Sequence, residues 1–195
     1  MRPPAPKQER PALGVLLMAL AVMFFTCIDT SAKWLMMAGL PPLQVVFCRY
    51  LGHFLTALVV FLPTEGPGLF RSANWKLQFL RSSFLLGSTI LNFTALSYLP
   101  ITVNTTIQFA GPIMITLLSI PLLGEKVGIS RVLAVCIGFV GVLIVMQPWG
   151  AQFHPAMFLI LAALVCSSLY FILTRKLAGR ERNATHQVWG SGVAV

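Results

Sequence analysis

Long apolar runs follow one another along this chain, each close to the ~20 residues that an α-helix needs to cross a ~30 Å hydrocarbon layer. The runs predict helices over residues 13–37, 42–62, 77–98, 102–123, 129–147 and 156–174, with a further helix that begins near Thr185. Because 57% of the 195 residues are hydrophobic and only 10% are charged, the chain has too little polar surface for a soluble globule. The sequence therefore predicts an all-α polytopic membrane protein.

The basic residues lie on alternate connections between these helices. If the spans alternate across the membrane, one side holds Arg2, Lys7, Arg10, Arg71, Lys76, Lys126, Arg131, Arg175, Lys176, Arg180 and Arg182. The opposite connections, AGLPP, SYLPIT and QPWGAQFHPA, contain no Lys or Arg. The positive-inside rule then predicts a cytoplasmic tail over residues 1–11 and a multi-pass protein of the bacterial inner membrane. The net charge of +9 is thus a topology signal, and nucleic acid is not expected as a partner.

Four ionisable side chains interrupt the first two predicted helices. Asp29 and Lys33 lie one helical turn apart, as do Arg49 and His53, so each pair shares one face of its helix. A charge deep in the bilayer costs from ~2.5 to more than 10 kcal/mol, and such groups should face the protein interior or water. Asp29 and Arg49 lie at matching depths below the AGLPP turn. They are expected to pair.

Each of these residues also has a plainer interpretation. Lys33 lies close enough to the outer end of its helix to extend to the membrane interface as an anchor. The pair of Asp29 and Arg49 is alternatively a structural salt bridge. His53 is alternatively a packing or hydrogen-bonding residue rather than a proton carrier.

The third and fourth predicted helices carry amides at positions too polar for contact with lipid. Asn92 lies on the third helix, and Asn104 and Gln108 lie one turn apart on the fourth. Pro112 removes a backbone hydrogen bond near mid-membrane, which either frees a carbonyl toward a cavity or only kinks the helix. The predicted substrate-binding residues are Asp29, Lys33, Arg49, His53, Asn92, Asn104, Gln108 and Pro112.

Nothing in the sequence indicates a metal or a cofactor. The cysteines, which lie within apolar runs and lack CxxC spacing, are expected to be small buried hydrophobes: Cys27, Cys48, Cys136 and Cys166. The almost wholly apolar fifth helix has small residues at Ala134, Gly138 and Gly141 that suit close packing within a subunit or between two copies. A homodimer is therefore left open.

A faint internal repeat relates the two ends of the chain. Residues 14–52 align with residues 157–195, with six identities in 39 positions. Five spans separate the two copies, and an odd number inverts the second copy in the membrane. Inverted repeats are common in secondary transporters, in which the substrate site lies at the midplane between the repeats.

The segment Leu96–Pro148 resembles the EamA-type domain of the drug/metabolite transporter superfamily. The resemblance is carried by the Pro112 helix, the LLGEK turn at residues 122–126 and the GFVGVLIV stretch at residues 138–145. DTSAK at 29–33 and VVFCRY at 45–50 are similar to a subset of metabolite uptake carriers that includes riboflavin and S-adenosylmethionine transporters.

This resemblance implies ten helices in two inverted repeats of five. A central cavity would be lined mainly by the first four helices of each repeat. Residues 12–148 are then expected to form the first repeat. Residues 149–195 are expected to form the incomplete start of the second, in a truncated chain.

The function predicted from these features is secondary transport of small organic metabolites by alternating access, with a proton or an ion as a candidate coupling species. One carboxylate set against Arg49 and Lys33 favours a zwitterionic or anionic substrate. Two other functions are weighed against it. An intramembrane enzyme would need a nucleophile with a base or a metal cluster, and the chain has no HExxH and only an isolated GSG at residues 190–192. A non-transporting scaffold would leave the polar interior unexplained.

Overall fold

The computed structural model describes residues 11–70, 72, 74–123, 128–147, 150, 153–177 and 182–195. All regular elements in these ranges are helical, which confirms the predicted all-α class. The elements are α1 Pro11–Met37, α2 Pro42–Glu65, η1 Gly66–Phe70, α3 Trp75–Tyr98, α4 Ile101–Gln108, α5 Gly111–Leu123, α6 Ile129–Met146, α7 Ala156–Leu177 and α8 Asn183–Gly192. Most of the predicted cytoplasmic tail, the boundary at 148–149 and most of the LLGEK turn lie outside the described residues.

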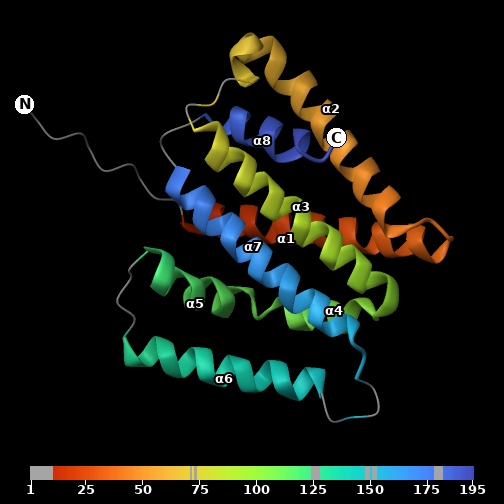
Figure 1. The fold of residues 1–195 in the computed structure, drawn as a ribbon, viewed down its shortest axis with the longest axis vertical. Coiled ribbons are helices and arrows are strands. Elements are labelled where there is room, and N and C mark those ends of the chain that lie inside the picture. Colours follow the sequence, from red (N-terminus) through yellow and green to blue (C-terminus); the bar gives the residue numbers. More distant parts are fainter. Residues whose placement is uncertain are drawn as a thin grey trace, which may run out of the picture.

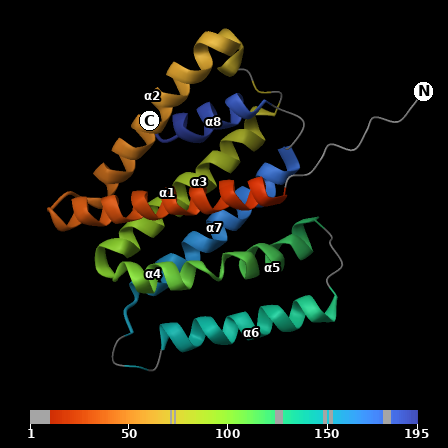
Figure 2. The same ribbon diagram turned by 180° about the vertical axis from the view of Figure 1, so that it is seen from behind.

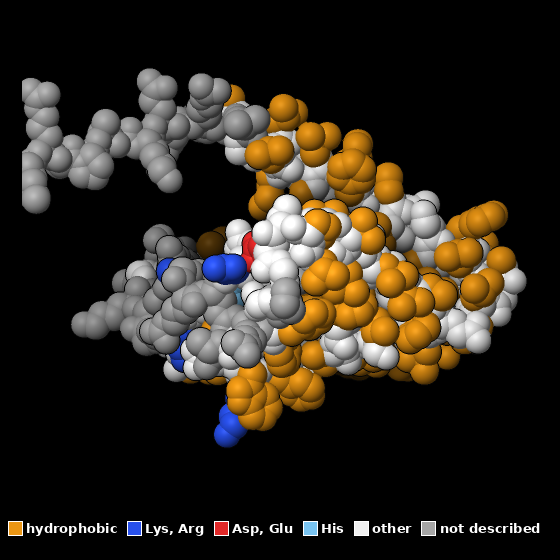
Figure 3. Space-filling view, turned by 90° about the horizontal axis from the view of Figure 1, so that it is seen from above, with side chains coloured by type: hydrophobic (Ala, Val, Ile, Leu, Met, Phe, Trp, Pro, Cys, Tyr) orange, Lys and Arg blue, Asp and Glu red, His pale blue; other side chains and the backbone are white. Residues whose placement is uncertain are grey.

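The chain is a polytopic membrane protein. Within the described ranges, four stretches are long and apolar enough to cross a bilayer: Gly14–Met37, Pro42–Glu65, Ile101–Leu122 and Ala156–Leu177. Helix α6 adds a shorter apolar stretch, Leu133–Ile144. Figure 3 shows hydrophobic side chains spread over much of the surface seen from one end, with few charged ones among them. Such a surface suits contact with lipid rather than with water.

Helices α3 and α7 lie side by side through the middle of the bundle (Figures 1 and 2). Helix α5 packs on α7, and α6 lies beyond α5. On the other side, α8 lies between α3 and α2, while α1 crosses the back of α3. Helix α7 runs in the opposite direction to α1, and α8 in the opposite direction to α2.

The helix ends fall on two sides. The start of α1, the end of α2, the start of α3, the end of α7 and the start of α8 lie on the left in Figure 1. The turn from α1 to α2 and the turn from α3 to α4 lie on the right. The exposed basic residues Lys76, Arg175, Lys176 and Arg182 are all on the first side. The described helix ends that carry these basic residues therefore lie together on one side of the bundle.

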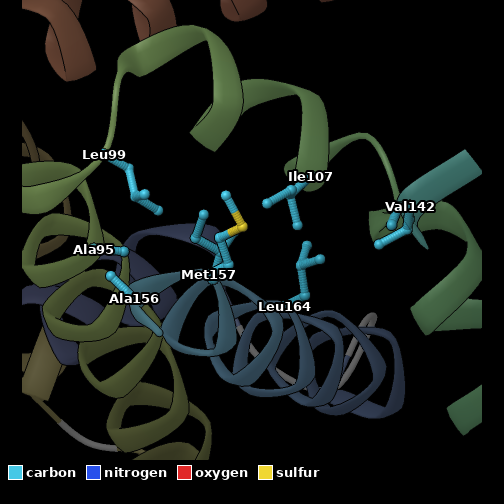
Figure 4. Close-up of a cluster of buried hydrophobic side chains, with 9 residues drawn as sticks. Ala95, Leu99, Ile107, Val142, Ala156, Met157 and Leu164 are labelled. Atoms are coloured by element: carbon cyan, nitrogen blue, oxygen red, sulfur yellow. The ribbon is translucent and has the colours of Figure 1, made fainter. Parts of the chain in front are cut away.

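The main apolar core joins α3, α4, α6 and α7 (Figure 4). Ile107 of α4 and Ile160 of α7 are completely buried in it. Leu164 and Met157 approach Ile107 from α7, and Val142 approaches from α6. Because lipid tails are as apolar as these side chains, close van der Waals packing rather than transfer out of water stabilises the core. This core holds α4 against α7.

The predicted helix 102–123 is interrupted. Helix α4 ends at Gln108, and α5 begins at Gly111 after a turn at Phe109 and Ala110. The turn is closed by the Ala110 N–H, which donates to the Ile107 carbonyl over 3.0 Å. Pro112 is the physical reason, because it has no N–H for the Gln108 carbonyl and its ring crowds the preceding turn. The expectation of one continuous helix was wrong at this point, and Pro112 lies in the first turn of α5.

The structure also refines the predictions about small residues. A side chain at Gly138 would overlap Ile113 of α5, so this glycine makes the close helix contact that was predicted. Gly141 has no such neighbour, and Ala134 is exposed. The cysteines were predicted to be buried, but Cys27, Cys48 and Cys136 are exposed on the described chain, because their helices turn those faces outward. Cys166 is half-buried.

Candidate functional site

Three amides from α3 and α4 meet inside the bundle and are called the amide cluster here: Asn92, Asn104 and Gln108. Asn104 Nδ2 donates to Asn92 Oδ1 over 3.1 Å, and Gln108 Nε2 donates to the same oxygen over 2.9 Å. The contact forms because Asn104 and Gln108 are one turn apart on α4 and therefore share the face that meets α3. The structure therefore brings together the three amides among the predicted site residues.

Burial makes this cluster energetically demanding. Asn104 is 0% exposed, and within the described ranges its Oδ1 has no hydrogen-bond partner. Asn92 and Gln108 are half-buried. A buried polar atom without a partner costs about 1–3 kcal/mol. Polar groups inside membrane helices lower stability. They commonly mark a functional site for that reason.

Lys33 is bound to the backbone of another helix. Its ammonium donates to the Leu96 carbonyl over 2.6 Å and to the Leu99 carbonyl over 3.0 Å, at the C-terminal end of α3. These carbonyls belong to the last turn, where a helix lacks its own donors and carries partial negative charge. Lys33 therefore caps α3 and ties α1 to it. An anchor at the membrane interface, the alternative interpretation of Lys33, does not account for these two hydrogen bonds.

An open pocket of about 420 Å³ lies between α1, α2 and α3. Its lining is mostly apolar, with Phe24, Val45 and Phe93 among the wall residues, and Arg49 supplies its one charged group. The Arg49 guanidinium carbon lies 5.4 Å from the centre of the Phe93 ring, within cation–π range. The volume is in the range of small-molecule sites.

The expected ion pair between Asp29 and Arg49 is not formed. The structure records no contact of 4.0 Å or less between their charged atoms, although both residues lie within the described ranges. Helices α1 and α2 diverge from their shared turn (Figures 1 and 2), so equal depth does not bring the two side chains together. Asp29 is half-buried on α1 and is not among the residues that line the pocket.

His53 contacts α8 rather than the amide cluster. Its Nε2 lies 3.0 Å from Gln187 Oε1, and the imidazole is exposed on the described chain. This hydrogen bond links α2 to α8, which favours the hydrogen-bonding interpretation of His53. The predicted site residues therefore do not form one site. They separate into the amide cluster, the Arg49 pocket, the Lys33 cap and the His53 contact. Asp29 takes part in none of these, and Pro112 lies at the α4–α5 break.

Arg81 is not among the residues singled out from the sequence, yet it is buried, with 2% of its surface exposed. Its guanidinium donates to the Thr174 hydroxyl over 3.2 Å and to the His186 carbonyl over 2.7 Å. Gln78, 0% exposed, contacts the His186 ring nitrogen over 2.8 Å. The sequence did contain a sign of this polar face, because Gln78 and Arg81 are three residues apart and therefore share one face of α3. No group of metal-binding side chains occurs among the residues that the structure describes.

The sequence of this chain is similar to those of several known transporters. Residues 12–147 match the model of the EamA-like transporter family. The chain is 29% identical over 187 residues to a riboflavin transporter of Rhizobium johnstonii, covering 95% of this chain and 61% of that protein. It is 28% identical over 188 residues to a riboflavin transporter of Vibrio cholerae, covering 93% and 62%.

A similar match is found with a third relative. The chain is 25% identical over 173 residues to an S-adenosylmethionine uptake transporter of Rickettsia bellii, covering 87% of this chain and 58% of that protein. The chain thus spans about three fifths of the length of these relatives. No solved structure gave a significant match. The family model covers most of the helical bundle that holds the amide cluster and the Arg49 pocket, and the chain belongs to the EamA-like transporter family.

Proposed function

We propose that this protein is a secondary transporter that carries small organic metabolites across the cell membrane by alternating access. It is not proposed to act as an enzyme, because its polar groups are arranged to bind rather than to activate a nucleophile. The relatives named above are riboflavin and S-adenosylmethionine transporters, which supports a small metabolite as substrate.

The observation that carries the proposal is the amide cluster beside an interrupted helix. Asn104 and Gln108 occupy α4, whose eight residues end at the Phe109–Ala110 break. Secondary transporters commonly build substrate sites from discontinuous helices near mid-membrane. A short helix with a break on one side can change position without unfolding the rest of the bundle. A cluster that is buried in one arrangement can then be opened in another.

The charge of the substrate is proposed from the Arg49 pocket. Lys33 is already bound to α3 carbonyls, so Arg49 is the remaining cation from the predicted set that faces a pocket. It would receive the anionic group of a zwitterionic or anionic substrate. Asn92 and Phe93 are consecutive residues of α3 and therefore point in different directions, so the amide cluster and the Arg49 pocket are two separate contacts of this helix.

The orientation of the protein and the membrane that holds it are proposed from the distribution of basic residues. The basic helix ends would face the cytoplasm of a bacterial cell, with the N-terminus on that side, and the membrane would be the inner membrane. Coupling to a proton or an ion and assembly into a homodimer are both compatible with this arrangement. The exposed apolar faces of the helices would contact lipid.

Flux measurements in proteoliposomes test the transport proposal. The purified protein should take up radiolabelled riboflavin or S-adenosylmethionine with saturation. Vesicles preloaded with unlabelled substrate should show faster uptake, because counterflow is typical of a carrier. Flux of both compounds no greater than in protein-free vesicles would refute the proposal.

Competition by riboflavin 5′-phosphate tests the charge of the substrate. If Arg49 receives an anionic group, this phosphate should compete more strongly than uncharged riboflavin. Arg49→Gln should remove the difference. Equal competition in the unmodified protein would contradict the assignment of Arg49.

A further inference from the structure

Among the described residues, one buried polar atom of the amide cluster has no hydrogen-bond partner. Asn92 Oδ1 accepts both hydrogen bonds of the cluster, and Asn104 Oδ1 is buried without a partner in the described ranges. Turning all three amides over exchanges every donor and acceptor, and Asn104 Nδ2 then becomes the unpaired atom. In either arrangement one atom of Asn104 needs a partner that the described helices do not provide.

The chemistry of that partner follows from the surroundings. Within the described ranges, no charged side chain hydrogen-bonds to the amide cluster. A charged group brought to it would remain uncompensated in a low-dielectric site, which is costly. An uncharged group that offers an N–H next to a carbonyl matches Asn104 in both arrangements and can also engage the half-buried amides of Asn92 and Gln108.

We infer that the amide cluster binds an uncharged amide or imide edge of the transported metabolite. This inference rests on the proposed function, because it names the substrate chemistry of the same site. The structure shows the cluster closed, since Asn104 is 0% exposed. Movement of α4 between Pro100 and the Phe109–Ala110 break opens it.

Two flavins that differ at one atom provide the probe. Riboflavin has an imide N–H between two carbonyls, and 3-methylriboflavin has a methyl group in place of that hydrogen. Dissociation constants are measured by flavin fluorescence on the purified protein. Riboflavin should bind about 10–100-fold more tightly. Methylation removes the N–H that Asn104 Oδ1 would accept, and in the turned arrangement it places a methyl group between the Asn104 amide and the flavin carbonyls.

The variant Asn104→Leu assigns the preference to this residue. The ratio of the two dissociation constants should fall toward one, since leucine has no acceptor to satisfy. The matched control is Thr106→Val on the same helix. Its hydroxyl bonds only the Thr102 carbonyl of its own helix, over 2.7 Å, so the ratio should not change.

The outcomes separate the inference from the proposed function. Equal binding of the two flavins by the unmodified protein overturns the inference, and this test needs no variant. A ratio unchanged in Asn104→Leu also overturns it, in favour of a buried water as the partner of Asn104. Saturable flux of S-adenosylmethionine without riboflavin binding overturns the inference and leaves transport intact. Absence of saturable flux and of binding for every probe overturns both.

Discussion

Replacing Lys33 with methionine keeps an unbranched side chain of nearly the same length and removes the ammonium that caps α3. The ammonium makes two hydrogen bonds, of 2.6 Å and 3.0 Å, to carbonyls at the end of that helix. Hydrogen bonds that involve a charged group contribute about 1.5–3 kcal/mol each, and a cation at a helix C-terminus adds ~0.3–1 kcal/mol. The desolvation cost of the ammonium offsets part of this sum. The expected loss is about 2–4 kcal/mol in the free energy of unfolding.

The measurement is an unfolding titration of the purified protein in detergent micelles, followed by circular dichroism. Lys76→Met is the control, because Lys76 is exposed and lies 5.7 Å from the Trp75 ring centre. An exposed cation–π contact contributes ~0.5–1 kcal/mol, so the control should lose less than ~1 kcal/mol. A Lys33→Met protein within ~0.5 kcal/mol of the unmodified one would refute the capping role. That result would instead favour an ammonium that extends to the membrane interface.

Three further predictions test orientation, packing and charge. In an otherwise cysteine-free protein in intact cells, Ala38→Cys should react with a membrane-impermeant thiol reagent and Thr64→Cys should not; the reverse pattern would invert the proposed topology. Gly138→Leu should lower the free energy of unfolding by about 1–3 kcal/mol, because the new side chain overlaps α5, and an unchanged value would show that α6 moves freely. Asp29→Asn and Arg49→Gln should have additive effects on stability, with a coupling below ~0.5 kcal/mol; a large coupling would show that the two charges pair.

Helix positions were predictable because apolar runs and turn residues determine them locally. The predicted helix 42–62 corresponds to α2, and the predicted helix 77–98 corresponds to α3, with ends within a few residues. The shared face of Asn104 and Gln108 also followed from helical spacing alone. Both properties depend only on neighbours along the chain.

The failed and missed side-chain contacts depend on helix crossing angles. Asp29 and Arg49 have matching depths, but the divergence of α1 from α2 separates them, and no local pattern specifies that angle. The partners of Lys33 are backbone carbonyls, which leave no side-chain signature in the sequence. Arg81 finds Thr174 and His186 about a hundred positions later in the chain. Such contacts are visible only when the helices are packed.

Among the contacts between helices described above, helix α3 takes part in every polar one except that of His53 with Gln187. Near the start of α3, Gln78 and Arg81 bind α7 and α8, while its other end is capped by Lys33 of α1. Between them, Asn92 holds α4 and the adjacent Phe93 forms the wall of the Arg49 pocket.

A helix fixed at both ends by buried hydrogen bonds is a poor candidate for large local motion, because regions with few buried contacts open first. Motion that opens the site is therefore expected in α4, beside its break, and at the divergence of α1 from α2. Both regions contact α3, the first through Asn92 and the second through Phe93. Transport by this protein would then depend on α3 as the fixed element against which α4 moves.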